Sequence, residues 1–416
     1  MSLSNEWNAR LKHWMSKLET LFYTPLGQIE MTGFTTLQQL SAAEALKMDF
    51  TPMPAGTKWG AKWEYGWFKG TITIPEKAKG ERIVLDIKTG GESVVYVDGG
   101  IRGHRRDDWI IVQHHFISDL MLCKSAIPGE SYELLIESYA GHGERKCDIG
   151  PVLPGTLSPY EPGTTQASVE ASTFGIWNEE AYQLWMDITT LLDIRNNINP
   201  NSLRTVEIDK GLKDFTLIVD FEQPYGERVN SFKECRKRLK PLLECRNGST
   251  TPLMKVFGHS HIDVAWLWPL AETERKCART FSTQLAHLEE YPDYIFLQSQ
   301  PHLYGMTKRL YPELYAKITE KVKEGRFIPE GGMWVEADTN ITGGESLIRQ
   351  FIHGKRFFRE EFGVENELLW LPDVFGYSAA LPQIMKGCGI KYFSTQKIFW
   401  DYNQGERFPY NYFNWQ

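Results

Sequence analysis

Hydrophobic residues recur along this chain at two different spacings, and each spacing predicts a different kind of element. In residues 5–22 they stand three and four positions apart, which is typical of an amphipathic helix. From about 56 to 145 they lie instead in short β-branched and aromatic runs. Clusters of Gly, Pro, Asp and Lys separate the runs, and this pattern favours a β-sandwich. The runs are WFKGTITIP, RIVLDIKT, ESVVYVDG, DWIIVQHHF (108–116) and SYELLIESY.

Beyond the sandwich the pattern becomes helical and then alternates. Residues 150–168 are rich in Pro, Gly, Ser and Thr, which indicates a linker, and two helices are expected at roughly 176–193 and 227–245. From 254 onward, strands are predicted in MKVFGH, YIFLQSQ, RFIPEGGMWVEAD, ELLWLPD and KYFSTQK. Helices are predicted between them at 272–290, at 302–324 with a break at Pro312, at 345–362 and, as a short one, in AALPQIMKGCG. Strands separated by helices in this way form βα units and a parallel sheet.

We therefore expect a multidomain chain of the α/β plus β class, since 416 residues are too many for one ordinary core. The expected parts are an N-terminal helical segment (1–50), a β-sandwich accessory domain (51–150), a linker with helices (151–250) and a parallel α/β domain (251–416). Five strands would only begin a (β/α) barrel, and its open edge would leave backbone groups unpaired. The sequence thus predicts an incomplete barrel-like domain that is truncated at its C-terminus.

Composition excludes several classes of partner. The net charge of −7 and the scattered basic residues argue against nucleic acid. No apolar run approaches the roughly 20 residues that cross a bilayer, and the charged N-terminus lacks the apolar stretch of a signal peptide. The six cysteines are scattered without a CxxC pair, as in a reducing compartment. These features predict a cytoplasmic protein with no membrane partner.

The stretch GHSHIDVAWLW (258–268) carries the most suggestive chemistry. His259, His261 and Asp263 alternate just past the first predicted strand of the α/β domain. Side chains two residues apart on an extended backbone point to the same side, and working residues in parallel domains gather at the C-terminal ends of strands. An H-x-D or an H-x-H pair could thus hold a metal ion such as zinc. The alternative is a capping Asp beside a hydrogen-bonded His.

Other predicted strand ends supply further candidates. Asp373 in WLPDVFGYS can act as a metal ligand, a nucleophile or both, and Glu336 and Asp338 in WVEADTN either join the site or cap the following helix. SQPH (299–302) and TQK (395–397) add polar groups at two more ends. The aromatic content of 13%, with 14 Trp, is consistent with large cores or with stacking on sugar rings.

Three functions remain open on these residues. His259 and His261 could hold zinc in a metal-dependent amidohydrolase or deacetylase. A metal held by His261, Asp263 and Asp373 could instead grip a sugar while Asp373 attacks the anomeric carbon. The third function is a non-catalytic carbohydrate-binding protein.

The motifs HIDVAWLWPLAET, WVEADTN, GGESLIRQF, WLPDVFGYSAALPQIMKGCGIKYFSTQK and RFPYNYFNW resemble glycoside hydrolase family 38, the zinc-dependent α-mannosidases. The similarity runs from about 254 to 416 and is closest to the branch with cytosolic eukaryotic and many bacterial members. It implies that His261 and Asp263 are zinc ligands and that Asp373 is both a ligand and the nucleophile. It also implies that Trp266 and Phe375 line the sugar site. Lys397 stands where some members carry Arg, and His259 lies outside the family's ligand set.

The resemblance implies a retaining α-mannosidase that hydrolyses terminal α-mannosides of oligosaccharides or glycans through a mannosyl-enzyme intermediate on Asp373. The implied cofactor is one Zn²⁺ per active site, with other divalent cations also compatible. A homo-oligomer is compatible with the sequence as well. The family uses a further histidine ligand and an acid/base aspartate, and no position before Gln416 matches either of them. Both are expected beyond Gln416.

Overall fold

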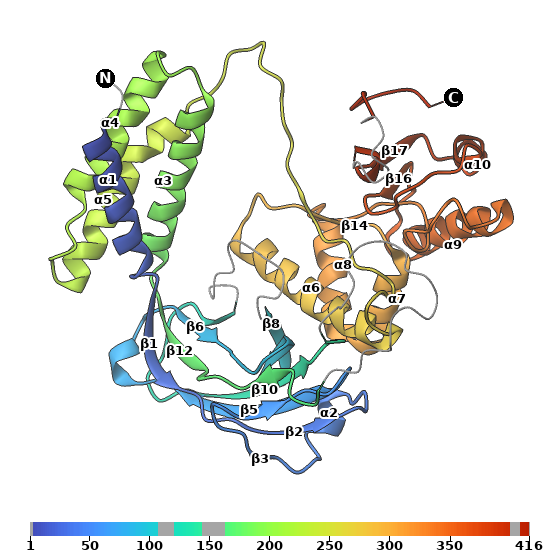
Figure 1. Ribbon diagram of the computed structural model, residues 1–416, viewed down its shortest axis with the longest axis horizontal. Helices are drawn as coiled ribbons and strands as arrows, with labels where there is room; N and C mark the ends of the chain where they lie inside the picture. Colours follow the sequence, from blue (N-terminus) through green and yellow to red (C-terminus); the bar gives the residue numbers. More distant parts are fainter. Residues whose placement is uncertain (1–2, 107–119, 144–162, 400–407, 416) are drawn as a thin grey trace.

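The protein was examined as a computed structural model that describes residues 3–106, 120–143, 163–399 and 408–415. The chain forms a β-sandwich, then a helical bundle and then an α/β part (Figure 1). The first helix of the chain, which precedes the sandwich, also packs in the bundle. The run 108–116 and most of the 150–168 linker lie outside the described residues.

Two antiparallel sheets form the sandwich. One has the strand order β3–β2–β5–β10–β7–β8 and the other β1–β12–β6–β9, with a small β11–β4 pair beside them. Apolar residues from facing strands, such as Phe68, Ile83, Val95 and Ile136, are fully buried between the sheets. The strands are β1 (Tyr23–Gln28), β2 (Thr32–Thr36), β3 (Thr51–Pro52), β4 (Lys58–Trp59), β5 (Tyr65–Thr73), β6 (Ile83–Asp86), β7 (Glu92–Val97), β8 (Gly100–Arg106), β9 (Met121–Cys123), β10 (Ser131–Tyr139), β11 (Ala167–Ser168) and β12 (Thr173–Trp177), with the short helix α2 (Ala42–Ala45) between β2 and β3.

The sandwich takes in residues on both sides of the expected range 51–150. β1 and β2 come from the segment expected to be helical, and β12, which pairs with β1 and β6, comes from the segment expected to be linker and helices. Pro25 and Gly27 sit at an irregularity in the β1 register, and such residues weaken a strand signal. Long-range pairing therefore decides these strands, and the expected boundaries at 50 and 150 were wrong in this respect.

The helical bundle consists of α1 (Asn5–Glu19), α3 (Glu179–Asn197), α4 (Leu203–Ile218) and α5 (Tyr225–Leu243). The helices expected at 5–22, 176–193 and 227–245 are present, but α4 was not expected. Gly211 lies inside α4, where a glycine lowers helix propensity. A Cβ at this position would lie 2.5 Å from Leu242 Cδ1 of α5, so the glycine lets the two helices approach closely.

The α/β part contains the alternation that the sequence predicts. Pro312 stands at the first turn of α8 and separates it from α7, as expected. Gly363, with φ of 70°, ends α9 in the left-handed conformation. The elements are β13 (Gly258–His259), α6 (Leu270–Glu290), β14 (Phe296–Gln298), α7 (Pro301–Leu310), α8 (Pro312–Lys323), β15 (Phe327–Pro329), α9 (Gly344–Phe362), β16 (Leu368–Leu371), α10 (Leu381–Gly387) and β17 (Tyr392–Thr395).

All strand pairs of the α/β part are parallel among the described residues. β13, β14 and β15 form one sheet, and β16 pairs with β17 in another. The two sheets are joined by a backbone hydrogen bond of 3.3 Å, from the Trp370 N–H of β16 to the carbonyl of Gly331, which follows β15. β13 begins only at Gly258, because its partner β14 begins at Phe296. Residues 254–257 of the expected strand therefore lie outside it, and Met254 is 83% exposed.

Buried charges join the sandwich to α6, the helix that follows GHSHIDVAWLW. Arg275 Nε donates to Glu137 Oε1 of β10 at 2.6 Å, and both side chains are almost fully buried. Lys276 Nζ contacts Glu92 Oε2 of β7 at 2.6 Å. Removing one partner of such a pair leaves an uncompensated buried charge, which is costly. These pairs therefore hold α6 at a defined place on the sandwich, and Figure 1 shows α6 beside β8 of that domain.

None of the described helices has both the length and the apolar character needed to cross a bilayer. The cysteines that the structure describes are free thiols, at positions 123, 235, 245, 277 and 388.

Candidate metal centre

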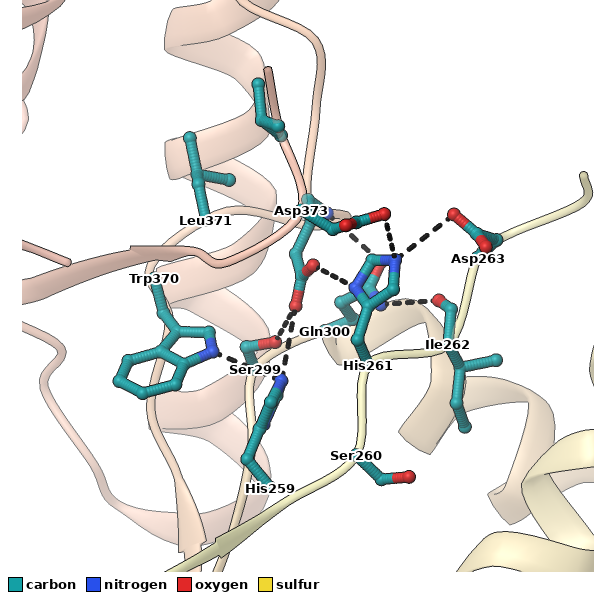
Figure 2. A network of polar contacts seen from close by, with 12 residues as sticks. His259, Ser260, His261, Ile262, Asp263, Ser299, Gln300, Trp370, Leu371 and Asp373 are labelled. Carbon is teal, nitrogen blue, oxygen red and sulfur yellow. Dashed lines mark hydrogen bonds and ion pairs between the residues drawn. The ribbon is translucent and has the colours of Figure 1, made fainter. Parts of the chain in front are cut away.

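Three potential metal ligands from two strand ends meet at one point. His261 and Asp263 follow β13, and Asp373 follows β16. One ligand atom from each of the three residues lies within 4.8 Å of the other two. His261 Nε2 is 3.1 Å from Asp263 Oδ1 and 3.4 Å from Asp373 Oδ2 (Figure 2). The structure thus brings together the three residues that the sequence reasoning chose as metal ligands.

The carboxylates around His261 strongly affect its protonation. Burial lowers the pKa of His261, but hydrogen bonds and charges from Asp263 and Glu336 outweigh it and raise the pKa to about 10. The cluster therefore has a net attraction for a positive charge at its centre. A metal ion that binds Nε2 would take the place of the proton there, since a histidine ligates in its neutral form.

Glu336 is the partner of the second ring nitrogen of His261. Its Oε2 lies 2.5 Å from His261 Nδ1, and its side chain is only 3% exposed. Ser299 Oγ donates to Glu336 Oε1 at 2.5 Å, and the Glu336 N–H donates to Gln300 Oε1 at 3.0 Å. Gln300 Nε2 in turn donates to the Ile262 carbonyl at 2.8 Å.

The two acidic residues of WVEADTN therefore differ in their surroundings. Glu336 contacts His261 of the cluster, whereas Asp338 Oδ1 accepts the N–H groups of Asn340 and Ile341 at 2.8 and 2.9 Å. Asp338 thus stabilises a local turn that ends before α9. Both acids follow the same predicted strand, so their position in the sequence could not separate these two roles.

His259 lies next to the cluster, but both of its ring nitrogens are engaged elsewhere. Nδ1 lies 3.1 Å from the Leu297 carbonyl, and Nε2 accepts the indole N–H of Trp370 at 3.2 Å (Figure 2). This pattern requires a neutral ring with its proton on Nδ1. Burial also lowers the pKa of His259. His259 of β13 therefore forms hydrogen bonds to residues of β14 and β16. In this arrangement it has no free nitrogen for an ion.

Thr273 of α6 holds the loop that carries Asp263. Its Oγ1 accepts the N–H of Ala265 at 3.0 Å and the indole N–H of Trp268 at 3.1 Å, and it donates to the Asp263 carbonyl at 3.3 Å. Ala265 has φ of 67°, a left-handed conformation that is costly for a residue with a Cβ. Such strain persists only where the surroundings hold it, and here the fully buried Thr273 does so.

Lys397 lies on the other side of Asp373. Its ammonium contacts Asp373 Oδ1 at 2.6 Å, and its side chain is only 9% exposed. The other carboxylate oxygen, Oδ2, is the one that faces His261. The residue from TQK at the fifth strand end thus orients Asp373, so that its two oxygens have different partners.

The two aromatic residues expected to bind sugar follow candidate ligands in the sequence and face solvent. Trp266 is 54% exposed and Phe375 is 67% exposed. Trp266 packs edge-on against Trp268, with the ring centroids 5.5 Å apart. Lys397 Nζ lies 5.7 Å from the centroid of the Phe375 ring. Both rings lie two or three residues after a candidate ligand and offer accessible apolar surface.

Two parts of the chain match models of known protein families. Residues 252–416 match the model of the glycosyl hydrolases family 38 N-terminal domain, and residues 25–157 match that of an alpha-mannosidase jelly roll domain. Residues 252–416 of the chain belong to glycoside hydrolase family 38. The family 38 match contains all three clustered residues, and the jelly roll match covers most of the sandwich.

Several relatives named alpha-mannosidase are similar to this chain, and two of the following three match most of its length. It is 34% identical to alpha-mannosidase G of Dictyostelium discoideum over 91% of its length and 32% identical to human alpha-mannosidase 2C1 over 98%. It is 41% identical to an alpha-mannosidase of Saccharomyces cerevisiae over 45% of its length. The matched parts make up 34%, 39% and 18% of these relatives. The chain thus matches 34% and 39% of the length of the first two relatives and less of the third.

Proposed function

We propose that this chain forms part of a retaining, zinc-dependent α-mannosidase that acts on terminal α-mannosides of oligosaccharides or glycans. The observation that carries the proposal is the meeting of His261, Asp263 and Asp373 at the ends of two parallel strands, inside the region that matches family 38. The relatives named above are alpha-mannosidases by name, which supports the substrate class.

The donor set suits zinc. Zinc binds imidazole nitrogen and carboxylate oxygen in proteins, and the acids around His261 favour a cation. When bound, such an ion supplies a Lewis acid that grips sugar hydroxyl groups. Other divalent cations remain compatible with these ligands. We therefore assign His261 Nε2, Asp263 and Asp373 as ligands of one Zn²⁺.

Asp373 is the proposed nucleophile. One of its carboxylate oxygens forms a bond to the anomeric carbon while the glycosidic bond breaks, and the leaving oxygen takes a proton from an acid. Water then releases mannose from the covalent intermediate with net retention. Lys397 holds Asp373 by one oxygen and so fixes the direction of attack.

Trp266 and Phe375 complete the proposed sugar site. A pyranose ring has an apolar face that packs well against a flat aromatic ring. Both side chains are largely exposed and follow a proposed ligand by two or three residues, so a sugar can reach them without rearrangement of the core. We propose that they position the mannose over Asp373.

The wider architecture belongs to the same proposal. The strands β13 to β17 are parallel, and the bond from Trp370 to Gly331 joins the two small sheets. We propose that they form part of a (β/α) barrel whose catalytic edge carries the cluster. The range 251–416 remains our proposed catalytic domain.

The test is hydrolysis of a chromogenic aryl α-mannoside by the protein as its gene encodes it, with and without zinc. We expect Asp373→Asn to abolish turnover while the circular dichroism spectrum and melting temperature stay near those of the parent. Asp338→Asn is the matched control, because that aspartate stabilises only a local turn. Full activity in Asp373→Asn would refute the nucleophile.

The same assay separates the alternatives. Hydrolysis of N-acetylated amides without mannosidase activity would support an amidohydrolase or deacetylase. Binding of mannosides without turnover, measured by calorimetry, would support a carbohydrate-binding protein.

A further inference from the structure

The ring of His261 has two nitrogens, and only one of them faces the other two candidate ligands. Nε2 faces Asp263 and Asp373, whereas Nδ1 points to Glu336. In a neutral imidazole, a proton on Nδ1 leaves Nε2 free to ligate, and the reverse tautomer does not. The partner of Nδ1 therefore decides whether His261 can serve as a ligand at the shared point.

We propose that Glu336 is the positioning residue of the metal centre: it accepts the Nδ1–H of His261, selects the tautomer with a free Nε2 and fixes the plane of the ring. This inference rests on the proposed metal site. Carboxylates that hold a ligating histidine in this way raise its basicity, and their loss usually costs about 10- to 100-fold in metal affinity.

The surroundings of Glu336 fix its carboxylate in place, so its contact with His261 is not a chance one. The Glu336 side chain is 3% exposed, and its second oxygen accepts the hydroxyl of Ser299. Its backbone N–H is fixed by Gln300, which also binds the carbonyl of Ile262 between the two proposed ligands His261 and Asp263. Figure 2 shows Ser299 and Gln300 beside His261. Residues after β14 and β15 thus hold a carboxylate against a ligand that follows β13.

The alternative role, that of a direct ligand, is less consistent with the geometry. Each of the two carboxylate oxygens already has a close partner at 2.5 Å, namely His261 Nδ1 and Ser299 Oγ. The group of ligand atoms that lie within 4.8 Å of one another contains His261, Asp263 and Asp373 among the described residues. Glu336 therefore acts on the ion through His261.

The experiment measures the zinc affinity of the protein as its gene encodes it, by competition with a chromogenic chelator. We expect Glu336→Ala to lower the affinity about 10- to 100-fold. Glu336→Gln keeps a neutral acceptor for Nδ1–H and should lose less. Ser299→Ala tests the support of Glu336 without altering it and should give a small loss. The matched control is Glu330→Gln, because Glu330 follows β15 as well but accepts the backbone N–H of Leu368.

A second measurement reports the tautomer directly. In the zinc-loaded chain with ¹⁵N-labelled histidine, the resonances lost in His261→Ala identify this ring, and we expect its proton on Nδ1. Melting temperatures of the ion-free variants check the fold, and Glu336→Gln and Ser299→Ala carry the test if Glu336→Ala unfolds.

The outcomes separate this inference from the proposed function. If the parent chain binds zinc and His261→Ala does not, but the Glu336 and Ser299 variants match the parent, the inference fails alone. A proton on Nε2 in the loaded chain would also overturn it. If the parent and His261→Ala bind zinc equally weakly, the metal site itself is wrong.

Discussion

Replacing His259 should separate stability from metal binding. His259→Ala removes the acceptor of the Trp370 indole N–H and the donor to the Leu297 carbonyl. A buried polar group left without its partner costs about 1–3 kcal/mol. The His259 side chain is 15% exposed, so water can satisfy part of this loss. We therefore expect a total destabilisation of about 2–4 kcal/mol, which is large against a typical stability of about 5–15 kcal/mol.

The zinc affinity of the same variant should stay near the parent value, because the hydrogen bonds of His259 go to Leu297 and Trp370 and its Nε2 lies 4.0 Å from Glu336 Oε1, not against a proposed ligand. His261→Ala, which removes a proposed ligand, should lower the affinity by more than the roughly 100-fold that loss of a supporting residue can cause. Urea unfolding of the ion-free chains gives the stability, and chelator competition gives the affinity. Ser260→Ala serves as the control in the same segment, because it keeps the backbone carbonyl that Gln298 binds.

The reasoning would be refuted by the reverse pattern, in which His259→Ala loses zinc at unchanged stability and His261→Ala retains it. That result would favour the H-x-H pair of an amidohydrolase over the H-x-D pair of a mannosidase.

Three further predictions concern the supports of the site and the core. Thr273→Val should lower both zinc affinity and stability, the latter by about 1–3 kcal/mol, because its hydroxyl holds the Asp263 loop; Thr273→Ser should restore most of both in the same titrations. Phe281→Ala should cost about 3–5 kcal/mol in urea unfolding, because the ring is fully buried, whereas the 66% exposed Leu217 should tolerate Ala with little change. Burial raises the pKa of Glu272 to about 7 from 4.5, although Arg279 opposes the shift. The folded state therefore holds this proton above pH 4.5, so stability falls as the pH rises from 4.5 toward 7. Unfolding of Glu272→Gln should depend less on pH in that window, and an unchanged pH profile would contradict the shift.

Local patterns predicted much of the fold because they depend on neighbours in the sequence. The break at Pro312, the helix ending at Gly363 and the alternation of strands and helices from 258 onward all follow from residue type and spacing. The strands β1 and β12 did not follow from such patterns, because each is specified by a partner about 150 residues away. The helix α4 was missed because Gly211, unfavourable in isolation, is selected by its contact with α5.

The same division holds at the candidate site. The sequence by itself determined the alternation of His259, His261 and Asp263 after a strand and the presence of Asp373 after another strand, because period-two geometry and strand ends are local features. The tertiary structure alone decided which nitrogen of each histidine is engaged, that Glu336 supports His261 while Asp338 caps a turn, and that Lys397 pairs with Asp373. These choices depend on which strand ends become neighbours, and only the packed sheets bring those ends within hydrogen-bonding distance.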